Sequence, residues 1–205
     1  MKLYNAYRSP NCLRVRAVIH ELELCVELVE IDLLSRERPP ELMAINPNGK
    51  VPAFVDDDGF SLFESRAINA YLASKRPERG LYPGDPKRRA IVDQWSYWQA
   101  IHLGPVVQAV ALERVLKPEL GLGTTDEALV AQKLAVLDKQ LAVLEIGLEG
   151  KEWLAGSLSL ADFATAAPFV LRDRAGISLA KATKVEAWLR RVEALPSWQR
   201  ARQNS

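Results

Sequence analysis

The chain has 205 residues, of which 48% are hydrophobic and 26% are charged, a composition typical of a globular protein that folds without metals or disulfides. A formal net charge of +1 excludes the dense basic surface that nucleic-acid binding requires. No apolar run reaches the ~20 residues that cross a bilayer, and the polar start lacks a signal-peptide core. We therefore expect no nucleic-acid or membrane partner and a cytoplasmic location.

The first 76 residues alternate strand and helix patterns. An extended start through Leu3 and Tyr7 comes before apolar residues at helical spacing, which are Val15, Val18, Ile19 and Leu22. A second strand is predicted near residues 26–33, and a short helix over about 36–45 would carry the chain back across a sheet. This order predicts a βαβ unit.

A hairpin and a third helix follow. The short apolar segments 53–55 and 60–63 flank Asp57-Asp58-Gly59, an Asp-Gly turn signal, and residues 65–75 have a helical pattern. Residues 1–76 are therefore predicted to form an α/β, thioredoxin-like domain with a mixed four-stranded sheet.

Residues 77–86 are predicted to be a linker, because they hold three prolines and two glycines. The remainder, 87–205, is predicted to be an all-helical bundle. Its first helix begins at Asp85-Pro86, with an N-cap followed by proline, and should be kinked or broken at Gly104-Pro105.

Two capping boxes are predicted inside the helical domain, one from Thr124 and Glu127 and one from Ser159 and Asp162. The first should start an amphipathic helix, whose apolar stripe is Val130, Leu134, Leu137, Leu141, Leu144 and Leu148. A last helical pair is expected near 184–195 and 198–203.

Ser9-Pro10 opens the first helix, where unpaired backbone N–H groups and the helix dipole stabilise an anion. Alternatively, Ser9 only caps the helix. Cys12, one turn further, is either a reactive thiol with a lowered pKa or a small buried hydrophobe. Cys12 and Cys25 lack metal-ligand spacing and should be reduced thiols, and the chain has only two histidines, so we expect no metal.

The segment Asn46-Pro47-Asn48-Gly49-Lys50-Val51-Pro52 combines turn formers with a candidate cis proline. Val51 would then offer its backbone N–H and C=O to an extended peptide ligand. Alternatively, the segment is an ordinary loop that ends at an edge strand.

Glu64-Ser65-Arg66 lies where the second hairpin strand meets the third helix. A carboxylate beside a helix N-terminus with a hydroxyl can hold both charged groups of an α-amino acid. Alternatively, the segment is an ordinary helix N-terminus with an acidic first turn.

An aromatic cluster follows the linker and consists of Trp95, Tyr97, Trp98 and His102. Large aromatic residues at helical spacing usually pack a core, and this is the assignment for the tryptophans. Tyr97 and His102 remain candidates for the wall of a pocket.

Together, these motifs resemble the cytosolic glutathione transferase superfamily across nearly the whole chain. The segment from Leu3-Tyr4 to Ser9-Pro10-Asn11 and Arg14 is similar to the active-site segment of the serine-type theta and phi classes, and we expect a bacterial member of that type. Residues 46–52 look like the family's cis-proline loop, and Glu64-Ser65-Arg66-Ala67-Ile68 like its γ-glutamyl-binding motif. Leu81-Tyr82-Pro83 matches the linker, and Ser159-Leu160-Ala161-Asp162 the capping box of a buried helix.

The resemblance implies that Ser9 donates a hydrogen bond to the glutathione sulfur and that Val51 pairs with the cysteinyl backbone. Glu64 and Ser65 would hold the γ-glutamyl end. A hydroxyl donor at a helix N-terminus lowers the pKa of a thiol, ordinarily ~8.5, so that more of the ligand is nucleophilic thiolate.

The glycyl carboxylate would face Lys50 and also Arg38. An electrophile held mainly by the helical domain would contact a pocket whose candidate residues are Asn11, Cys12, Tyr97 and His102. The family further implies a homodimer with Arg66 near the partner.

We therefore expect a detoxifying glutathione transferase, with glutathione as cosubstrate. One alternative is a glutathione-dependent peroxidase or disulfide reductase that uses Cys12, although cysteine-based relatives carry the cysteine at the position of Ser9. Another is a non-catalytic stress or regulatory protein, which would have lost the ligand-binding set. The sequence does not identify the electrophile or the pathway.

Overall fold

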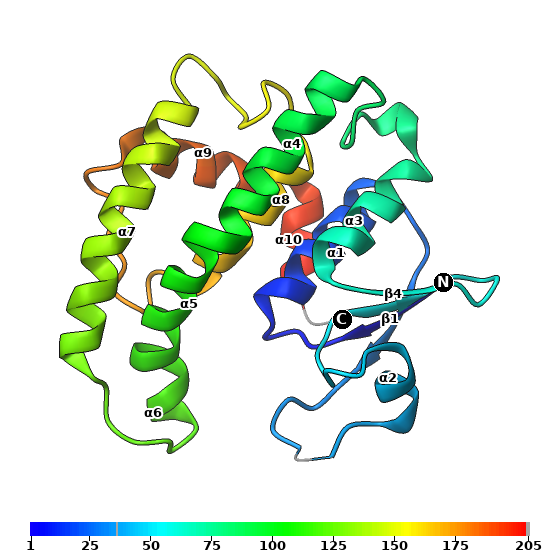
Figure 1. The fold of residues 1–205 in the computed structure, drawn as a ribbon, viewed down its shortest axis with the longest axis horizontal. Helices are drawn as coiled ribbons and strands as arrows, with labels where there is room; N and C mark the ends of the chain where they lie inside the picture. The colour runs from blue at the N-terminus through cyan, green and yellow to red at the C-terminus, as the bar shows by residue number, and fades with distance from the viewer. Residues whose placement is uncertain (36, 204–205) are drawn as a thin grey trace. The chain divides into compact units, whose positions relative to one another are not determined.

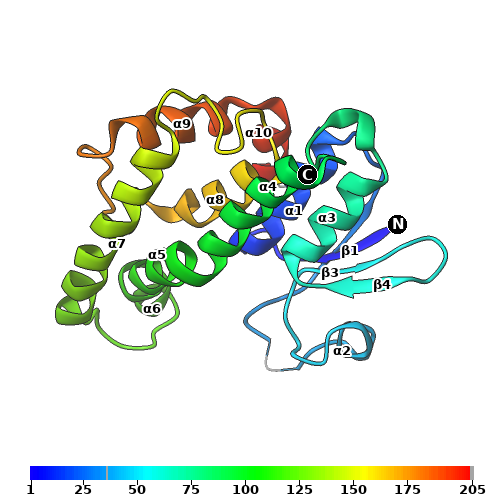
Figure 2. The same cartoon turned by 45° about the horizontal axis from the view of Figure 1, so that its top comes forward.

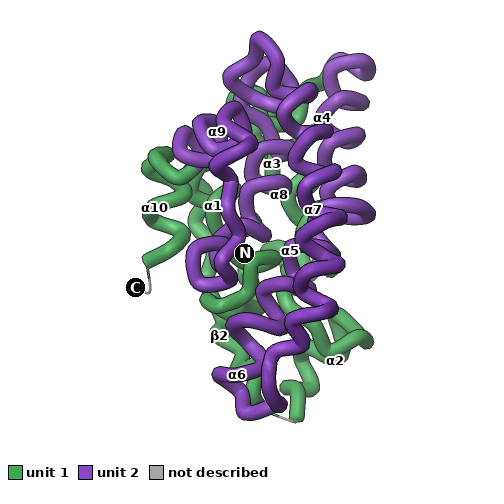
Figure 3. The backbone as a smooth tube through the Cα atoms, turned by 90° about the vertical axis from the view of Figure 1, so that its left-hand side faces the viewer, with its two compact units in different colours: residues 1–84, 193–205 green, residues 85–192 purple. Residues whose placement is uncertain are grey.

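The computed structural model describes residues 1–35 and 37–203 of the chain. It divides into two compact units, Met1–Gly84 with Glu193–Ser205 and Asp85–Val192 (Figure 3). Arg36, where the second helix was expected to begin, and residues 204–205 of the expected helical domain lie outside the described residues. No helix among the described residues is both long enough and apolar enough to cross a bilayer.

The first unit is built on the predicted four-stranded mixed sheet. Its strands are β1 (Lys2–Asn5), β2 (Glu27–Glu30), β3 (Ala53–Val55) and β4 (Ser61–Phe63). Their order is β2-β1-β3-β4, with β1 and β2 parallel and the other pairs antiparallel. In this register Leu3 pairs with Leu28 on one side and with Phe54 on the other. The thioredoxin-like prediction is confirmed.

Helices cover both faces of this sheet. They are α1 (Pro10–Glu21), α2 (Pro40–Ile45) and α3 (Ser65–Ser74), and a fourth helix of the unit is α10 (Pro196–Arg202). The helices α1 and α3 lie on one side of the sheet and α2 on the other (Figures 1 and 2). On the α2 side, Tyr4, Ile31, Leu42 and Ala53 form a buried cluster.

The last helix, α10, belongs to the first compact unit and packs against α1. Its Trp198 is 1% exposed, and the Ala201 carbonyl accepts a hydrogen bond at 2.9 Å from Nε of the buried Arg16. The sequence pattern grouped this helix with the preceding ones, because neither burial nor the partner of Arg16 can be seen in a helical periodicity.

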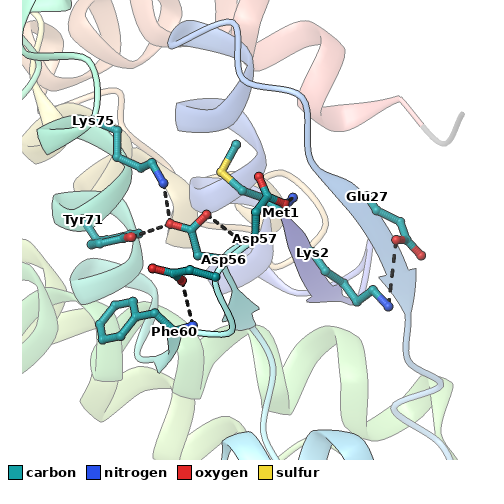
Figure 4. A network of polar contacts seen from close by, with 9 residues as sticks. Met1, Lys2, Glu27, Asp56, Asp57, Phe60, Tyr71 and Lys75 are labelled. Atoms are coloured by element: carbon teal, nitrogen blue, oxygen red, sulfur yellow. Dashed lines mark hydrogen bonds and ion pairs between the residues drawn. The ribbon is translucent and has the colours of Figure 1, made fainter.

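A polar network joins the β3–β4 hairpin to α3 (Figure 4). The buried Asp56 carboxylate accepts hydrogen bonds from Lys75 Nζ, from the Tyr71 hydroxyl and from the Asp57 backbone N–H. These hydrogen bonds lower the pKa of Asp56 to about 2, and the bond from Lys75 has the largest effect. The Tyr71 ring also packs against Phe60, so the hairpin fixes the helix that carries Ser65.

The second unit is helical, as predicted. Its helices are α4 (Pro86–Trp98), α5 (Gly104–Ala111), α6 (Lys117–Glu119), α7 (Glu127–Gly147), α8 (Leu160–Ala166) and most of α9 (Thr183–Ala194). A π-helical turn, Gln99–Leu103, lies where the kink was expected. Pro105 has no N–H to donate to the preceding turn, and a Cβ on Gly104 would lie 2.5 Å from Gln99 Nε2.

One predicted capping box is confirmed and the other is wrong. In α8, Ser159 and Asp162 form the full box, and the Asp162 carboxylate also accepts a bond from Trp188 Nε1 at 2.9 Å. The cap of α7 is Asp126, which accepts from the Leu129 N–H, and not Thr124. The backbone N–H of Asp126 donates to Glu113 Oε2 at 2.9 Å, a long-range contact that helps to hold Asp126 at the helix start.

Candidate functional site

Ser9 lies at the N-terminus of α1 with extended backbone angles, φ −83° and ψ 120°. Its hydroxyl oxygen accepts a hydrogen bond from the Cys12 backbone N–H at 3.4 Å, so the predicted cap is present. The side chain is half-buried. Because the cap uses Ser9 only as an acceptor, the hydroxyl proton stays available to a ligand atom. Capping and thiolate binding are therefore compatible roles.

Cys12 is fully buried, and its Sγ accepts a bond from the Ala6 N–H at 3.3 Å. Burial raises the pKa of the Cys12 thiol, which makes the thiolate scarcer. The expectation that Cys12 lines a pocket is therefore wrong, and the alternative of a small buried hydrophobe is confirmed. The neighbouring Asn11 is exposed.

A buried network holds the loop that leads to Ser9. The guanidinium of Arg16, 2% exposed, donates to Asn5 Oδ1 at 2.6 Å and to the Tyr7 carbonyl at 3.2 Å. The Glu30 carboxylate accepts from the Asn5 amide and from the Tyr7 N–H. Sequence reasoning missed this network, although an arginine between the apolar residues Val15 and Ala17 of a helix is a signal for it.

The loop before β3 has the predicted cis bond between Val51 and Pro52. Asn46 organises it, donating to the Lys50 carbonyl at 2.7 Å and accepting from the Asn48 N–H at 3.1 Å. The Val51 side chain packs on the cluster around Tyr4. Within residues 1–35 and 37–203, nothing hydrogen-bonds to the Val51 main chain, which is therefore open to an extended peptide.

Arg38 and Lys50 differ in their contacts. The Arg38 guanidinium donates to four backbone carbonyls, those of Asp32, Leu33, Ser35 and Gly49. These bonds give Arg38 a role in holding the loop, and a direct contact with a ligand carboxylate stays a prediction. The exposed Lys50 ammonium has no partner in the part of the chain that the structure describes.

Glu64 and Ser65 form the N-terminus of α3. Glu64 has φ 72° and ψ 111°, a backbone conformation that residues other than glycine rarely adopt, and its exposed side chain does not cap the helix. Ser65 is 3% exposed, and its hydroxyl accepts a bond from Arg14 Nη1 at 3.2 Å. The helix start thus lacks a side-chain cap and has strained backbone, a combination found at binding sites.

The remaining candidate residues lie in the second compact unit. Trp95 is buried and stacks edge-on against Trp98 with ring centroids 5.3 Å apart, so the core assignment is confirmed for Trp95. Tyr97 is 59% exposed and His102 is also exposed. Both side chains are accessible to a ligand.

Among residues 1–35 and 37–203, no group of three or more histidine, cysteine, aspartate or glutamate side chains is arranged to hold a metal ion.

Comparison with known proteins gives a consistent family. Residues 1–74 match the model of the glutathione S-transferase N-terminal domain, and residues 103–196 match that of the C-terminal domain. A glutathione S-transferase from Hyoscyamus muticus is 36% identical, over 98% of this chain and 97% of the relative.

Two solved structures are also similar. Glutathione S-transferase I from mais, in complex with an atrazine glutathione conjugate, is 34% identical with a TM-score of 0.88, over 98% of this chain and 95% of that one. A protein from Rhodopseudomonas palustris, called a possible glutathione S-transferase, is 31% identical with a TM-score of 0.86. The match covers 100% of this chain and 90% of that one.

Proposed function

The chain belongs to the glutathione S-transferase family, and we propose that Ser9 is the residue that holds the sulfur of glutathione as a thiolate. The enzyme uses glutathione as cosubstrate and conjugates it to electrophiles. One observation carries the assignment of Ser9: its hydroxyl accepts the capping bond from Cys12 and keeps its own proton for the ligand.

The chemistry needs no covalent enzyme intermediate. A hydroxyl donor and the N-terminus of α1 both favour the charged form of the sulfur, so the thiol loses its proton to solvent near neutral pH. The thiolate then attacks the electrophilic carbon, an S–C bond forms, and the leaving group departs with its electron pair. Holding the two reactants together supplies much of the rate.

The rest of the peptide is proposed to follow the open groups of the first unit. The Val51 main chain pairs with the cysteinyl residue, since it has no other partner in the described chain. Glu64 accepts from the γ-glutamyl amine, and Ser65 at the start of α3 donates to its carboxylate. Lys50 faces the glycyl carboxylate, and Arg38 supports the loop that presents Lys50.

In the second unit, Tyr97 and His102 are the proposed contacts of the electrophile, because both side chains are exposed. In the first unit the candidate is Asn11, which is also exposed. The alternative of a peroxidase or reductase that uses Cys12 has no support, because that thiol is buried and its pKa is raised. The non-catalytic alternative is disfavoured because the proposed ligand set is present.

Several broader assignments are also proposals. We propose a cytoplasmic homodimer whose glutathione-binding domain is 1–76, followed by a linker at 77–86 and a helical domain at 87–205, of which the last helix, α10, packs with the first compact unit. A monomeric mass in dilute solution would contradict the dimer. That the chain is a bacterial member of the serine type stays a prediction. Two of the relatives above are plant proteins and one is bacterial.

The test of Ser9 is an ultraviolet titration of bound glutathione thiolate in the wild type and in Ser9→Ala. Removing a charge-assisted bond that contributes about 1.5–3 kcal/mol should raise the pKa of the bound thiol and lower turnover tenfold or more at neutral pH. The loss should shrink as the pH rises, with glutathione affinity nearly unchanged. Superimposable titration curves with equal turnover would remove Ser9 from the mechanism.

A further inference from the structure

One residue of α1, Arg16, joins the C-terminal helix α10 to the loop that precedes Ser9. Arg16 is 2% exposed, and each nitrogen of its guanidinium donates to the fold. Nε donates to the Ala201 carbonyl of α10 at 2.9 Å. Nη2 donates to the Tyr7 carbonyl at 3.2 Å, and Nη1 donates to Asn5 Oδ1 at 2.6 Å. A side chain from the middle of one helix thus holds the end of α10 and the loop after β1 at the same time.

The contact continues from Arg16 to Ser9 through the backbone of Ala6. Arg16 Nη1 also donates to the Ala6 carbonyl at 3.4 Å, and the same carbonyl accepts from the Ser9 N–H at 3.0 Å. The Ala6 N–H donates to Cys12 Sγ at 3.3 Å, and the Cys12 N–H donates to Ser9 Oγ at 3.4 Å. Ser9 therefore lies at the end of a continuous chain of hydrogen bonds that begins at α10.

Charged side chains, and not a strand or a helix, hold this loop. Residues 6–9 lie between β1 and α1 and belong to neither. The Glu30 carboxylate of β2 accepts from the Asn5 amide at 2.7 Å and from the Tyr7 N–H at 2.9 Å. The Arg16 guanidinium holds the Tyr7 carbonyl and lies 4.5 Å from the centroid of the Tyr7 ring. Because charge-assisted bonds are the strong ones, loss of the guanidinium should loosen the loop.

We propose that Arg16 is a positioning residue for the formation of the thiolate, which links α10 to the loop before α1 and so fixes the direction of the Ser9 hydroxyl. This inference rests on the proposed function, in which Ser9 donates to the sulfur of glutathione. A hydrogen bond weakens steeply when donor and acceptor are misaligned, and small displacements at a reacting atom are costly in rate. A loosened loop should therefore leave the peptide bound at Val51, Glu64 and Ser65 while the sulfur has a weaker donor.

The experiment is an ultraviolet titration of bound glutathione thiolate in Arg16→Met, which keeps an unbranched side chain but removes all of its donors. The pKa of the bound thiol should rise by about half a unit to one unit, so turnover below that pKa should fall roughly threefold to tenfold. The loss should vanish at high pH, with glutathione affinity nearly unchanged. A purely structural role would lower turnover equally at every pH and leave the pKa of the bound thiol in place, and this result would overturn the proposal.

The double variant of Arg16→Met and Ser9→Ala tests the route of the effect. If Arg16 acts through Ser9, then Arg16→Met should not raise the pKa of the bound thiol further once the hydroxyl is gone. A further rise would show that the charge acts directly on the sulfur and would overturn the positioning role.

The single variants separate the two levels of the inference. If Ser9→Ala titrates like wild type, the proposed function fails and this inference fails with it. If Ser9→Ala raises the pKa of the bound thiol and Arg16→Met does not, only the role of Arg16 is overturned.

Two further variants test the fork of Arg16 and the contact with α10, and they replace Arg16→Met if it does not fold. Arg16→Lys keeps the charge without the planar fork, so it should show most of the shift, and a wild-type pKa of the bound thiol would overturn the proposal. Ala201→Leu overpacks a contact in which Ala201 is 1% exposed, and it should raise the same pKa by a smaller amount. An unchanged pKa in Ala201→Leu would overturn the part assigned to α10.

The control for lost stability is Asp162→Ala, which removes a buried acceptor from the second compact unit. This variant should be less stable than wild type and should keep the wild-type pKa of the bound thiol. A rise in that pKa equal to the rise in Arg16→Met would mean that lost stability alone moves it, and would overturn the proposal.

Discussion

The N-termini of α1 and α3 belong to the same compact unit, yet they are built in opposite ways. Ser9 has ordinary extended backbone and caps its own helix by accepting from the Cys12 N–H. Glu64 has positive φ and its side chain caps nothing, while the Ser65 hydroxyl beside it accepts from a buried arginine.

The difference separates two ways in which a helix start can serve a ligand. At α1 the same hydroxyl can stabilise the fold and hold an anion, because it has both lone pairs and a proton. At α3 the backbone is strained, no side chain caps the helix, and the Ser65 hydroxyl accepts from the buried Arg14, so this start lacks the stabilising cap that α1 has. We expect mutations at the two places to affect stability and binding in different proportions.

The largest expected effect on stability comes from the N-terminus of α8, which contributes to folding and not to binding. Asp162→Ala would leave the Leu154 N–H and Trp188 Nε1 buried without an acceptor. At ~1–3 kcal/mol for each lost partner, the free energy of unfolding should fall by about 3–5 kcal/mol. Denaturant unfolding measures it, with activity per folded molecule unchanged.

The matched control is Asp126→Ala, which removes the exposed cap of α7 and should cost about 1 kcal/mol. Equal losses in the two variants would show that burial of the Asp162 network adds nothing.

The second prediction separates capping from chemistry at Ser9. Ser9→Asp keeps a good N-cap but replaces the donor with a negative charge beside the thiolate, so the melting temperature should hold while turnover at neutral pH falls at least tenfold. Ser9→Ala should lose similar turnover and also about 1 kcal/mol of stability. Thermal melts and initial rates on the same samples decide it, and an active Ser9→Asp would contradict the donor role.

A smaller effect should come from releasing the strain at Glu64. Glu64→Gly permits the positive φ without a side-chain clash and should raise the free energy of unfolding by about 1 kcal/mol, or the melting temperature by ~2–4 °C. Glutathione affinity should fall roughly tenfold because the acceptor for the amine is lost.

The control is Glu23→Gly, at the other described non-glycine residue with positive φ, 53°. It should stabilise the protein less, because the exposed ion pair between Glu23 and Arg79 at 2.6 Å is lost, and it should leave glutathione affinity unchanged. A Glu64→Gly variant that is less stable than wild type would mean that the side chain relieves the strain.

The smallest effect is visible only in acid. The folded-state pKa of Asp56, about 2, lies below the ordinary value of ~3.9, so its contribution to stability is complete above about pH 4 and is lost as the pH falls toward 2. Asp56→Asn should flatten the stability curve in this window. Urea unfolding at pH 4, 3 and 2 tests it, and parallel curves for variant and wild type would contradict the assignment.

Much of the fold could be predicted because its signals are local. The Asp-Gly turn between β3 and β4, the Ser9-Pro10 helix start and the Ser159–Asp162 box each depend on residues within a few positions of one another. The cap of α7 shows the limit of such signals. Thr124 matched the local pattern, but Glu113 holds Asp126 from 13 positions away, and Asp126 became the cap.

The sequence by itself determined the alternation of elements, the candidate positions of the ligand-binding groups and the family that they resemble, because these follow from composition and short spacing. Only the tertiary structure decided which side chains lose their solvent. In the folded chain Cys12 is buried, and the Arg38 guanidinium donates to four backbone carbonyls. Arg14 forms a hydrogen bond with Ser65, which lies 51 positions away in the sequence. Burial and long-range pairing set the charge and the hydrogen bonds of a site, and both arise only when distant segments pack together.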